Sequence, residues 1–123
     1  MPHNAVRWFE IYVQNMDRAK KFYEAVFKVN LEKLNAPGLE MWSFPTQMNQ
    51  MGTGGSLVKM EGVPSGGNSV LVYFASDDCA VEEARVEANG GRIHRRKMSI
   101  GEYGFISLVY DTEGNTIGLH SMQ

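Results

Sequence analysis

Short stretches of alternating apolar and polar residues run along most of the chain, a pattern typical of β-strands with one buried face. The most informative stretch covers residues 101–121. There, residues 105–110 are apolar and β-rich, residues 111–115 contain the Asp, Gly and Asn that turns favour, and residues 116–120 alternate again. This pattern predicts a β-hairpin.

The second strand of that hairpin has two different faces. Ile117 and Leu119 suit a buried core. The other face carries Thr116, Gly118 and His120, and a glycine beside a histidine suits a cavity or a close backbone approach better than a packed layer. What this second face opens onto is therefore the functional question.

The first half of the chain predicts one strand, one helix and three more strands. Residues 6–13 alternate, with Trp8, Glu10 and Tyr12 on one face. Asn15 or Asp17 can cap the helix that follows. Its buried stripe would be Ala19, Phe22, Tyr23, Val26 and Phe27. Three extended segments come next, at residues 31–35, 39–44 and 55–60.

The same order of elements repeats after residues 61–67, the most linker-like stretch of the chain. A strand is predicted at residues 70–75, a helix at 79–89 and a strand at 92–99, followed by the hairpin. Asp77 and Asp78 supply a cap and favourable charge at the start of this helix. The inward side of this helix would carry Val81, Ala84 and Ala88.

Two strand–helix–three-strand units predict an α+β fold in which two βαβββ modules are related by a pseudo-twofold axis. Residues 1–123 would form a single domain, with module 1 at residues 5–60 and module 2 at residues 68–121. A ferredoxin-like βαββαβ sandwich is the competing fold, but it has fewer strands between its helices.

Composition limits the classes of protein to which the chain can belong. It has 123 residues, 43% hydrophobic and 21% charged, which is enough for one domain with a core. The net charge of -2 argues against nucleic acid or an anionic membrane as the main partner. Cys79 is the single cysteine, so no intrachain disulfide and no cysteine-rich zinc site can form. No signal-peptide pattern or membrane-spanning apolar run is visible, and we expect a cytoplasmic protein.

Three stretches of the sequence point to a known family. WFEIYVQNMDRAKKFYEAVF is similar to the first strand and helix of the vicinal-oxygen-chelate superfamily, which groups glyoxalase I, bleomycin-resistance proteins and extradiol dioxygenases. GGSLVKMEGVPSGGNSVLVYF and IGEYGFISLVYDTEGNTIGLHS resemble its glyoxalase-like branch. The resemblance covers nearly the whole chain. It implies two βαβββ modules whose strands curl into a ligand-holding cup, and it implies a homodimer.

The enzymes of this family usually hold a divalent metal with four side chains, one on each of four cup strands, and the metal stabilises charge on an enediolate. Carried over residue by residue, the ligand positions fall on Trp8, near Leu57, near Leu71 and on Gly118. None of these side chains can bind a metal, and a slip by one residue would turn to the opposite face. We therefore expect no cofactor, with a divalent metal at a shifted site as the alternative.

The resemblance leaves a set of side chains for the cup face. The candidate ligand-binding residues are Trp8, Tyr12, Trp42, Leu71, Tyr73 and Gly118, and Phe44 would add to an aromatic lining for a flat or apolar molecule. For any single one of these aromatic residues, ordinary core packing is favoured over a place in a ligand pocket. Glu10 and His120 are the candidate catalytic residues. They could form an acid/base pair, belong to a shifted metal site, or be a satisfied polar pair in a partly wet core.

Other residues have candidate roles outside that set. Residues 92–97 (Arg-Ile-His-Arg-Arg-Lys) carry positive charge on both faces of one strand, which fits protection of a sheet edge or, alternatively, steering of an anionic ligand. Met48 and Met51 could cover the pocket, or their loop could simply be loose. Cys79 is expected to be a small buried residue, and His3 a terminal one.

The sequence therefore predicts a glyoxalase-like protein that binds a small organic molecule in an aromatic-lined cup without the usual four-ligand metal site. The alternative is an enzyme of the lactoylglutathione-lyase type, metal-dependent or acid/base, acting through Glu10 and His120. The expected partners are a small molecule and a second copy of the chain, with no nucleic acid and no membrane.

Overall fold

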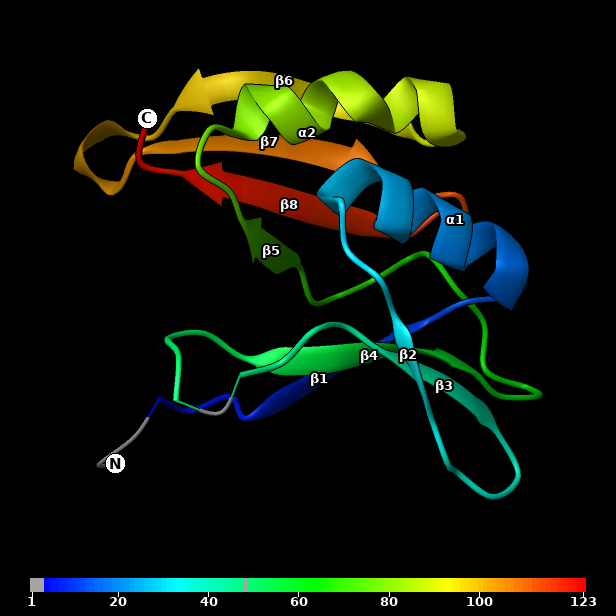
Figure 1. Ribbon diagram of the computed structural model, residues 1–123. Coiled ribbons are helices and arrows are strands. Elements are labelled where there is room, and N and C mark those ends of the chain that lie inside the picture. The colour runs from blue at the N-terminus through cyan, green and yellow to red at the C-terminus, as the bar shows by residue number, and fades with distance from the viewer. Residues whose placement is uncertain (1–3, 48) are drawn as a thin grey trace.

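The computed structural model describes residues 4–47 and 49–123, which form two four-stranded sheets and two α-helices (Figure 1). The first sheet has the order β1-β4-β3-β2, from Trp8–Tyr12, Gly54–Lys59, Glu40–Ser43 and Glu32–Leu34. The second has the order β5-β8-β7-β6, from Val72–Ala75, Thr116–Ser121, Phe105–Tyr110 and Arg92–Ser99. In each sheet the first pair is parallel and the others are antiparallel. Two sheets of identical order confirm the paired βαβββ fold and exclude the ferredoxin-like alternative.

Both α-helices begin at caps that the sequence predicts. Helix α1 (Met16–Phe27) begins after Asn15, whose side chain accepts from the backbone N–H of Arg18 at 3.0 Å. Helix α2 (Cys79–Val86) begins after Asp78, whose carboxylate accepts from the backbone N–H of Ala80 at 3.0 Å. Two 3-10 turns follow later, η1 (Glu87–Asn89) and η2 (Gly101–Tyr103).

The core fills the space between the helices and one face of each sheet. Figure 1 shows α2 lying along β6 and β7, with α1 next to it. The buried side of α1 is Met16, Ala19, Phe22, Tyr23 and Val26, close to the predicted stripe. At the centre, aromatic rings pack with centroids 4.5 to 6.1 Å apart, contributed by Phe9, Tyr23, Phe27, Phe44 and Phe74. The prediction of Phe44 as a cup residue is therefore wrong, because it lies in this core.

Helix α2 turns a different side inward than its apolar residues suggest. Val81 is 47% exposed, and Ala84 and Ala88 are also exposed. The buried side carries Cys79, Glu83 and Val86. The Glu83 carboxylate accepts from the backbone N–H of Lys97 at 2.6 Å and from the hydroxyl of Ser107 at 2.8 Å. Because these partners satisfy a buried carboxylate, the helix can orient a charged residue toward the sheet.

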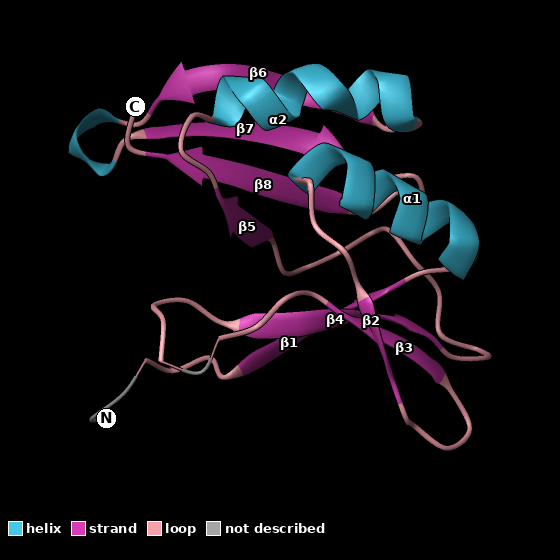
Figure 2. Ribbon diagram, in the orientation of Figure 1, coloured by secondary structure: helices cyan, strands magenta, loops and turns pink. Residues whose placement is uncertain are grey.

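Residues 60–71, between β4 and β5, contain no helix or strand (Figure 2). In the loop before β4, Met51 is 98% exposed, which fits the alternative of a loose loop better than a side chain packed over the cup. Met48 and His3 lie outside the described residues. None of the described helices combines the length and the apolar character that crossing a membrane requires.

Candidate functional site

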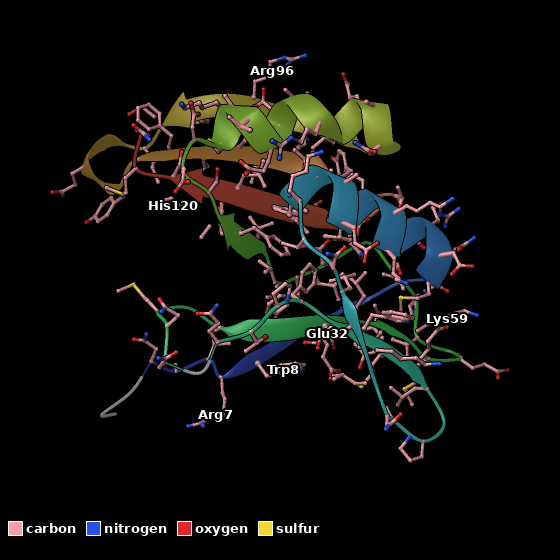
Figure 3. The ribbon with its side chains drawn as sticks, viewed as in Figure 1. Arg7, Trp8, Glu32, Lys59, Arg96 and His120 are labelled. Carbon is pink, nitrogen blue, oxygen red and sulfur yellow. The ribbon has the colours of Figure 1, made fainter. Side chains whose placement is uncertain are left out.

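The side of β1 that faces away from the helices carries three large side chains. Phe9 and Ile11 pack toward the core, so strand alternation directs Trp8, Glu10 and Tyr12 to the opposite side, as predicted. Figure 3 shows Trp8 on the side of β1 away from α1. Trp8 remains 40% exposed there, a large fraction for an indole side chain.

Register decides which residues of β4 share that side. The parallel pairing puts Gly54, Ser56 and Val58 beside Trp8, Glu10 and Tyr12, respectively. Leu57 pairs with Ile11 instead and is fully buried in the core. The prediction of Leu57 at a metal-ligand position on the cup face is therefore wrong, since a shift of one residue changes the face and register is not visible in the sequence.

Trp42 also lies on the helix side rather than on the cup face. It pairs with Leu57 across β3 and β4, and paired residues of neighbouring strands share a face. The ammonium nitrogen of Lys20, from α1, lies 3.3 Å from its ring centroid. Its indole N–H donates to Glu40 Oε2 at 3.0 Å. The prediction that Trp42 lines the cup is therefore wrong.

The second sheet presents an aromatic ring on the side away from the helices. Tyr73 pairs with Gly118 and is 46% exposed. A Cβ atom at Gly118 would lie 2.3 Å from the Cδ1 atom of Tyr73, so the ring rests directly on the glycine. Leu71, which precedes β5, is 36% exposed. His120 shares the face of Gly118 because Ile117 and Leu119 are buried in the core, as predicted.

These side chains come from β1 of the first sheet and from β5, the residue before it and β8 of the second sheet, in each case on the side away from the shared core. Phe9 of β1 and Phe74 of β5 meet edge to face on the helix side, with centroids 5.9 Å apart. Their sequence neighbours Trp8 and Tyr73 point the other way. We call this side the open face and define it by Trp8, Glu10, Tyr12, Leu71, Tyr73, Gly118 and His120.

A cavity of about 350 Å³ lies at one end of the open face, where β1, residues 64–70 and β8 come together. Glu10 and Tyr12 line one part of it and Thr116 another. The hydroxyl of Tyr12 donates to Glu10 Oε1 at 2.8 Å, and this hydrogen bond raises the pKa of Tyr12. Trp8, Tyr73 and His120 do not line the cavity, so the predicted site residues divide between the cavity and the wider open face.

Glu10 and His120 have different hydrogen-bond partners. Glu10 accepts from Tyr12, whereas the Nε2–H of His120 donates to the carbonyl oxygen of Tyr103 at 2.7 Å. Within residues 4–47 and 49–123, no hydrogen bond joins Glu10 to His120. The structure therefore does not assemble these two residues into an acid/base pair.

The side chains at the family's metal positions do not fit a metal ion. Trp8 and Leu71 offer no suitable donor atom, and Gly118 lies under a ring. Ser56 lies beside Glu10 as Gly118 lies beside Tyr73, so Ser56, which sequence reasoning missed, is the matching position in the first sheet. Its hydroxyl is buried and has no hydrogen-bond partner, but one hydroxyl is not a metal-ligand set. Among the described residues, no three His, Cys, Asp or Glu side chains come together in a possible metal site.

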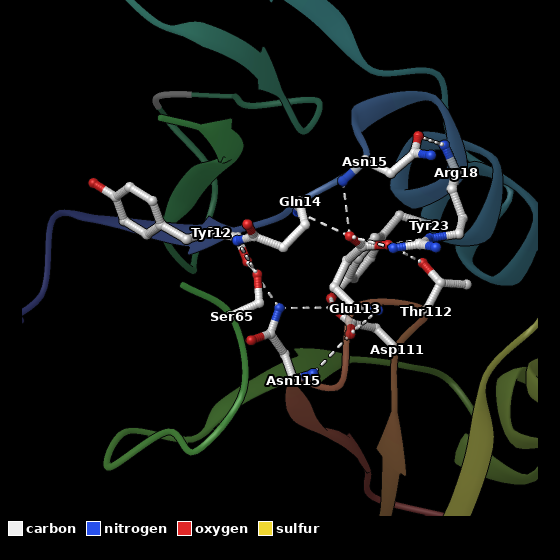
Figure 4. A network of polar contacts seen from close by, with 10 residues as sticks. All are labelled: Tyr12, Gln14, Asn15, Arg18, Tyr23, Ser65, Asp111, Thr112, Glu113 and Asn115. Carbon is white, nitrogen blue, oxygen red and sulfur yellow. Dashed lines mark hydrogen bonds and ion pairs between the residues drawn. The ribbon is translucent and has the colours of Figure 1, made fainter. Parts of the chain in front are cut away.

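The turn at residues 111–115 joins the two halves of the molecule instead of lining the open face (Figure 4). The Glu113 carboxylate accepts from the backbone N–H groups of Gln14 and Asn15 at 2.8 and 2.9 Å. It also forms an ion pair with Arg18 at 2.7 Å. The turn of the second module thus binds the corner between β1 and α1 of the first.

Asp111 organises the turn itself. Its Oδ1 accepts from the backbone N–H groups of Glu113 and Asn115, both at 2.8 Å, and its Oδ2 accepts from the hydroxyl of Tyr23 at 2.7 Å. The side-chain amide of Asn115 continues to the carbonyl oxygen of Tyr12 at 3.0 Å. We call this set the corner network and define it by Gln14, Asn15, Arg18, Tyr23, Asp111, Glu113 and Asn115.

The pKa values of the two carboxylates in the corner network are shifted in opposite directions. Burial raises the pKa of Asp111, against the opposing effect of its hydrogen bonds from Tyr23 and Asn115. Burial would also raise the pKa of Glu113, but the hydrogen bonds from Arg18 and the backbone N–H groups of Asn15 and Gln14 lower it to about 2. Burial, together with the charge of Asp111, holds the pKa of Tyr23 well above its usual value.

Comparison with known proteins agrees with the fold of two βαβββ modules. The family model described as Glyoxalase/Bleomycin resistance protein/Dioxygenase superfamily matches residues 5–119. An antibiotic-binding protein from Streptomyces sp. CB03234, TnmS3, has a similar structure with a TM-score of 0.74 at 22% identity, and the match covers 98% of each chain. Glyoxalase I from Zea mays gives a TM-score of 0.73 at 20% identity, covering 94% of this chain and 45% of the maize chain.

A glyoxalase/bleomycin resistance protein from Streptomyces sp. CB03234 gives a TM-score of 0.68 at 22% identity, covering 94% of this chain and 98% of the other. No curated protein sequence matches the chain. At these identities the solved structures establish a shared fold, while the family model matches almost the full length. The chain therefore belongs to the glyoxalase/bleomycin resistance protein/dioxygenase superfamily.

Proposed function

We propose that the protein binds a small, flat and largely apolar organic molecule on its open face, without the help of a metal ion. The observation that carries the proposal is the ring of Tyr73 resting on Gly118, where a side chain on the glycine would displace it. This arrangement gives a flat aromatic platform on the side of the second sheet that faces away from the core. A planar ligand can stack on such a platform.

Exposure of apolar surface supports the same proposal. Trp8, Leu71 and Tyr73 are 40%, 36% and 46% exposed, although their size favours burial. Large apolar side chains gathered on one side of a fold are typical of a binding surface. The similarity in fold to an antibiotic-binding protein is consistent with a ligand of this class.

Metal-independent binding is proposed on the chemistry of the side chains at the positions where the family resemblance implies metal ligands. These are Trp8, Leu71, Gly118 and, in place of Leu57, Ser56. Glu10 and His120 hydrogen bond to Tyr12 and to the backbone of Tyr103, so the proposal gives them no shared catalytic role. Homodimer formation, which the family resemblance implies, remains a prediction that analytical ultracentrifugation can check.

The test measures binding of phenylnaphthylamine, an uncharged aromatic probe whose fluorescence rises in an apolar site. Replacing Trp8 and Tyr73 together by alanine should raise its Kd about thirtyfold, because each aromatic contact contributes roughly 1 kcal/mol. Trp42→Phe is the matched control, since Trp42 lies on the helix side, and it should leave the Kd unchanged. Adding EDTA or a divalent metal salt should also leave it unchanged.

Two results would overturn the proposal. The first is a double variant that binds the probe as tightly as the parent protein does. The second is a loss of binding on addition of EDTA that is restored by a divalent metal. Circular dichroism of each variant establishes that the fold is retained.

A further inference from the structure

We infer that the molecule bound on the open face carries an anionic group, which Arg92 and Arg95 of strand β6 hold. This inference rests on the proposed function, because it specifies the class of ligand for the same face. Strand pairing extends the open face across the second sheet, from β5 to the outer strand β6.

Register aligns the aromatic platform with a cation. Tyr73 pairs with Gly118, Gly118 with Leu108, and Leu108 with Arg95, so these four residues form one row across the sheet. The register of β6 against β7 shifts on both sides of Arg95. Its pairing with Leu108, and its contact with the sulfur of Met98 on the same side, still put Arg95 on the side of the Tyr73 ring. Two strand spacings separate Gly118 from Arg95, about 10 Å between their backbones.

The next row of the sheet ends in a second cation. Thr116 pairs with Tyr110, and Tyr110 pairs with Arg92. The guanidinium carbon of Arg92 lies 4.8 Å from the centroid of the Tyr110 ring. His94 Nδ1 lies 3.1 Å from the hydroxyl of Tyr110. The ring of Tyr110 therefore orients both a guanidinium and an imidazole at this edge.

The two sides of β6 differ in how their positive charges are neutralised. On the helix side, Lys97 Nζ lies 2.7 Å from Asp78 and Arg96 lies 3.5 Å from Glu83. On the open side, Arg95 reaches only the sulfur of Met98, at 4.0 Å. Within residues 4–47 and 49–123, neither Arg92 nor Arg95 forms an ion pair with a carboxylate. Protection of a sheet edge explains positive charge on β6, but it does not explain why only the helix side is neutralised.

A ligand with an acidic substituent on an aromatic ring system matches this arrangement. Its rings would stack on Tyr73 above Gly118, and its carboxylate or sulfonate would extend toward β6. Guanidinium groups bind such oxyanions through paired N–H donors, which adds orientation as well as affinity. Glu10, an acidic residue of the open face, lies on the other sheet, so charge also favours this orientation of the ligand.

The experiment compares two probes with the same aromatic skeleton. Anilinonaphthalene sulfonate carries an anionic group, and phenylnaphthylamine does not. In the variant Arg92→Gln with Arg95→Gln, we expect the Kd of the sulfonate to rise about tenfold and the Kd of the uncharged probe to change less than about twofold. Arg96→Gln is the control, because it removes one positive charge from the other side of the same strand. It should leave both Kd values unchanged.

The outcomes separate this inference from the proposed function. If the arginine double variant binds both probes as the parent does, or if Arg96→Gln weakens the sulfonate as much as the double variant, the inference is wrong and the binding face stands. If the parent binds neither probe, or if alanine at Trp8 and Tyr73 affects neither, the proposed function fails and the inference fails with it. The inference is supported if the double variant weakens binding of the sulfonate alone, and if this difference from the parent disappears at high salt concentration.

Discussion

The corner network and the open face are built partly from the same hairpin, yet they differ in how their side chains are satisfied. In the corner network, Asp111 and Glu113 each accept several hydrogen bonds from the chain. On the open face, Trp8 and Tyr73 leave 40% and 46% of their surface exposed. Groups that the chain satisfies itself hold the fold together, whereas surface that the chain leaves uncovered is available to a ligand.

Two glycines show the same contrast between packed and exposed side chains. A Cβ atom at Gly55 would lie 2.3 Å from the ring of Phe9, and a Cβ atom at Gly118 would lie 2.3 Å from the ring of Tyr73. Phe9 packs within the aromatic core, while Tyr73 is nearly half exposed. The same steric arrangement therefore serves packing at one position and, in our proposal, ligand binding at the other.

Removing the carboxylate of Asp111 should have the largest effect on stability. Asp111→Ala leaves the buried Tyr23 hydroxyl and two backbone N–H groups of the turn without their acceptor, and we expect a loss of roughly 3–4 kcal/mol in the free energy of unfolding. Urea denaturation measures it, with Asp77→Ala as the control at an exposed aspartate. A loss below about 1 kcal/mol would contradict the structural role assigned to the corner network.

The glycine pair should separate stability from binding. Gly55→Ala forces the packed Phe9 ring to move and should cost about 2–3 kcal/mol, whereas Gly118→Ala moves the exposed Tyr73 ring and should cost less than about 1 kcal/mol. Gly118→Ala should instead weaken phenylnaphthylamine binding, because it displaces the platform. Equal destabilisation by the two substitutions, with binding unchanged by Gly118→Ala, would remove the distinction between the two sides of the sheets.

Acid should weaken the corner network through Glu113. Its folded pKa of about 2 lies below the ordinary value of 4.5, so ionised Glu113 stabilises the fold at neutral pH and this contribution is lost as the pH falls from 4.5 toward 2. Arg18 is half exposed, and solvent screening weakens its ion pair with Glu113. We therefore expect the free energy of unfolding to fall by only about 2 kcal/mol over that pH range.

Glu113→Gln provides the reference for this pH effect. The variant should be less stable at neutral pH, and it should lose less stability than the parent on acidification, as measured by urea unfolding at several pH values. Asp111 opposes the trend, since its raised pKa means that protonation favours its folded state. Parallel pH profiles for parent and variant would show that Glu113 does not carry the effect.

Local patterns in the sequence predict the elements well because their causes lie close together in the chain. Alternation located both faces of β1 and β8, and the short polar residues Asn15 and Asp78 marked the helix starts. The similarity between the two halves predicted two βαβββ modules, and the structure forms two sheets with the same strand order.

Long-range pairing explains what the sequence could not predict. Leu57 and Trp42 were assigned to the cup face, but the register of β4 against β1 and β3 places both on the helix side. Ser56 takes the position assigned to Leu57 for the same reason. Helix α2 turns Glu83 inward instead of the expected apolar side, because the partners that satisfy Glu83, Lys97 and Ser107, come from distant strands.

The two tryptophans of the chain allow the most direct test, because they lie on opposite sides of the first sheet. Trp8 is on the open face, and Trp42 packs under Lys20 on the helix side. In a nuclear magnetic resonance titration with phenylnaphthylamine, we predict that the indole N–H signal of Trp8 shifts while that of Trp42 stays in place, each assigned from a Trp→Phe variant. A shift of the Trp42 signal alone, or no shift of either signal at saturating probe, would contradict the claim that the open face binds the ligand.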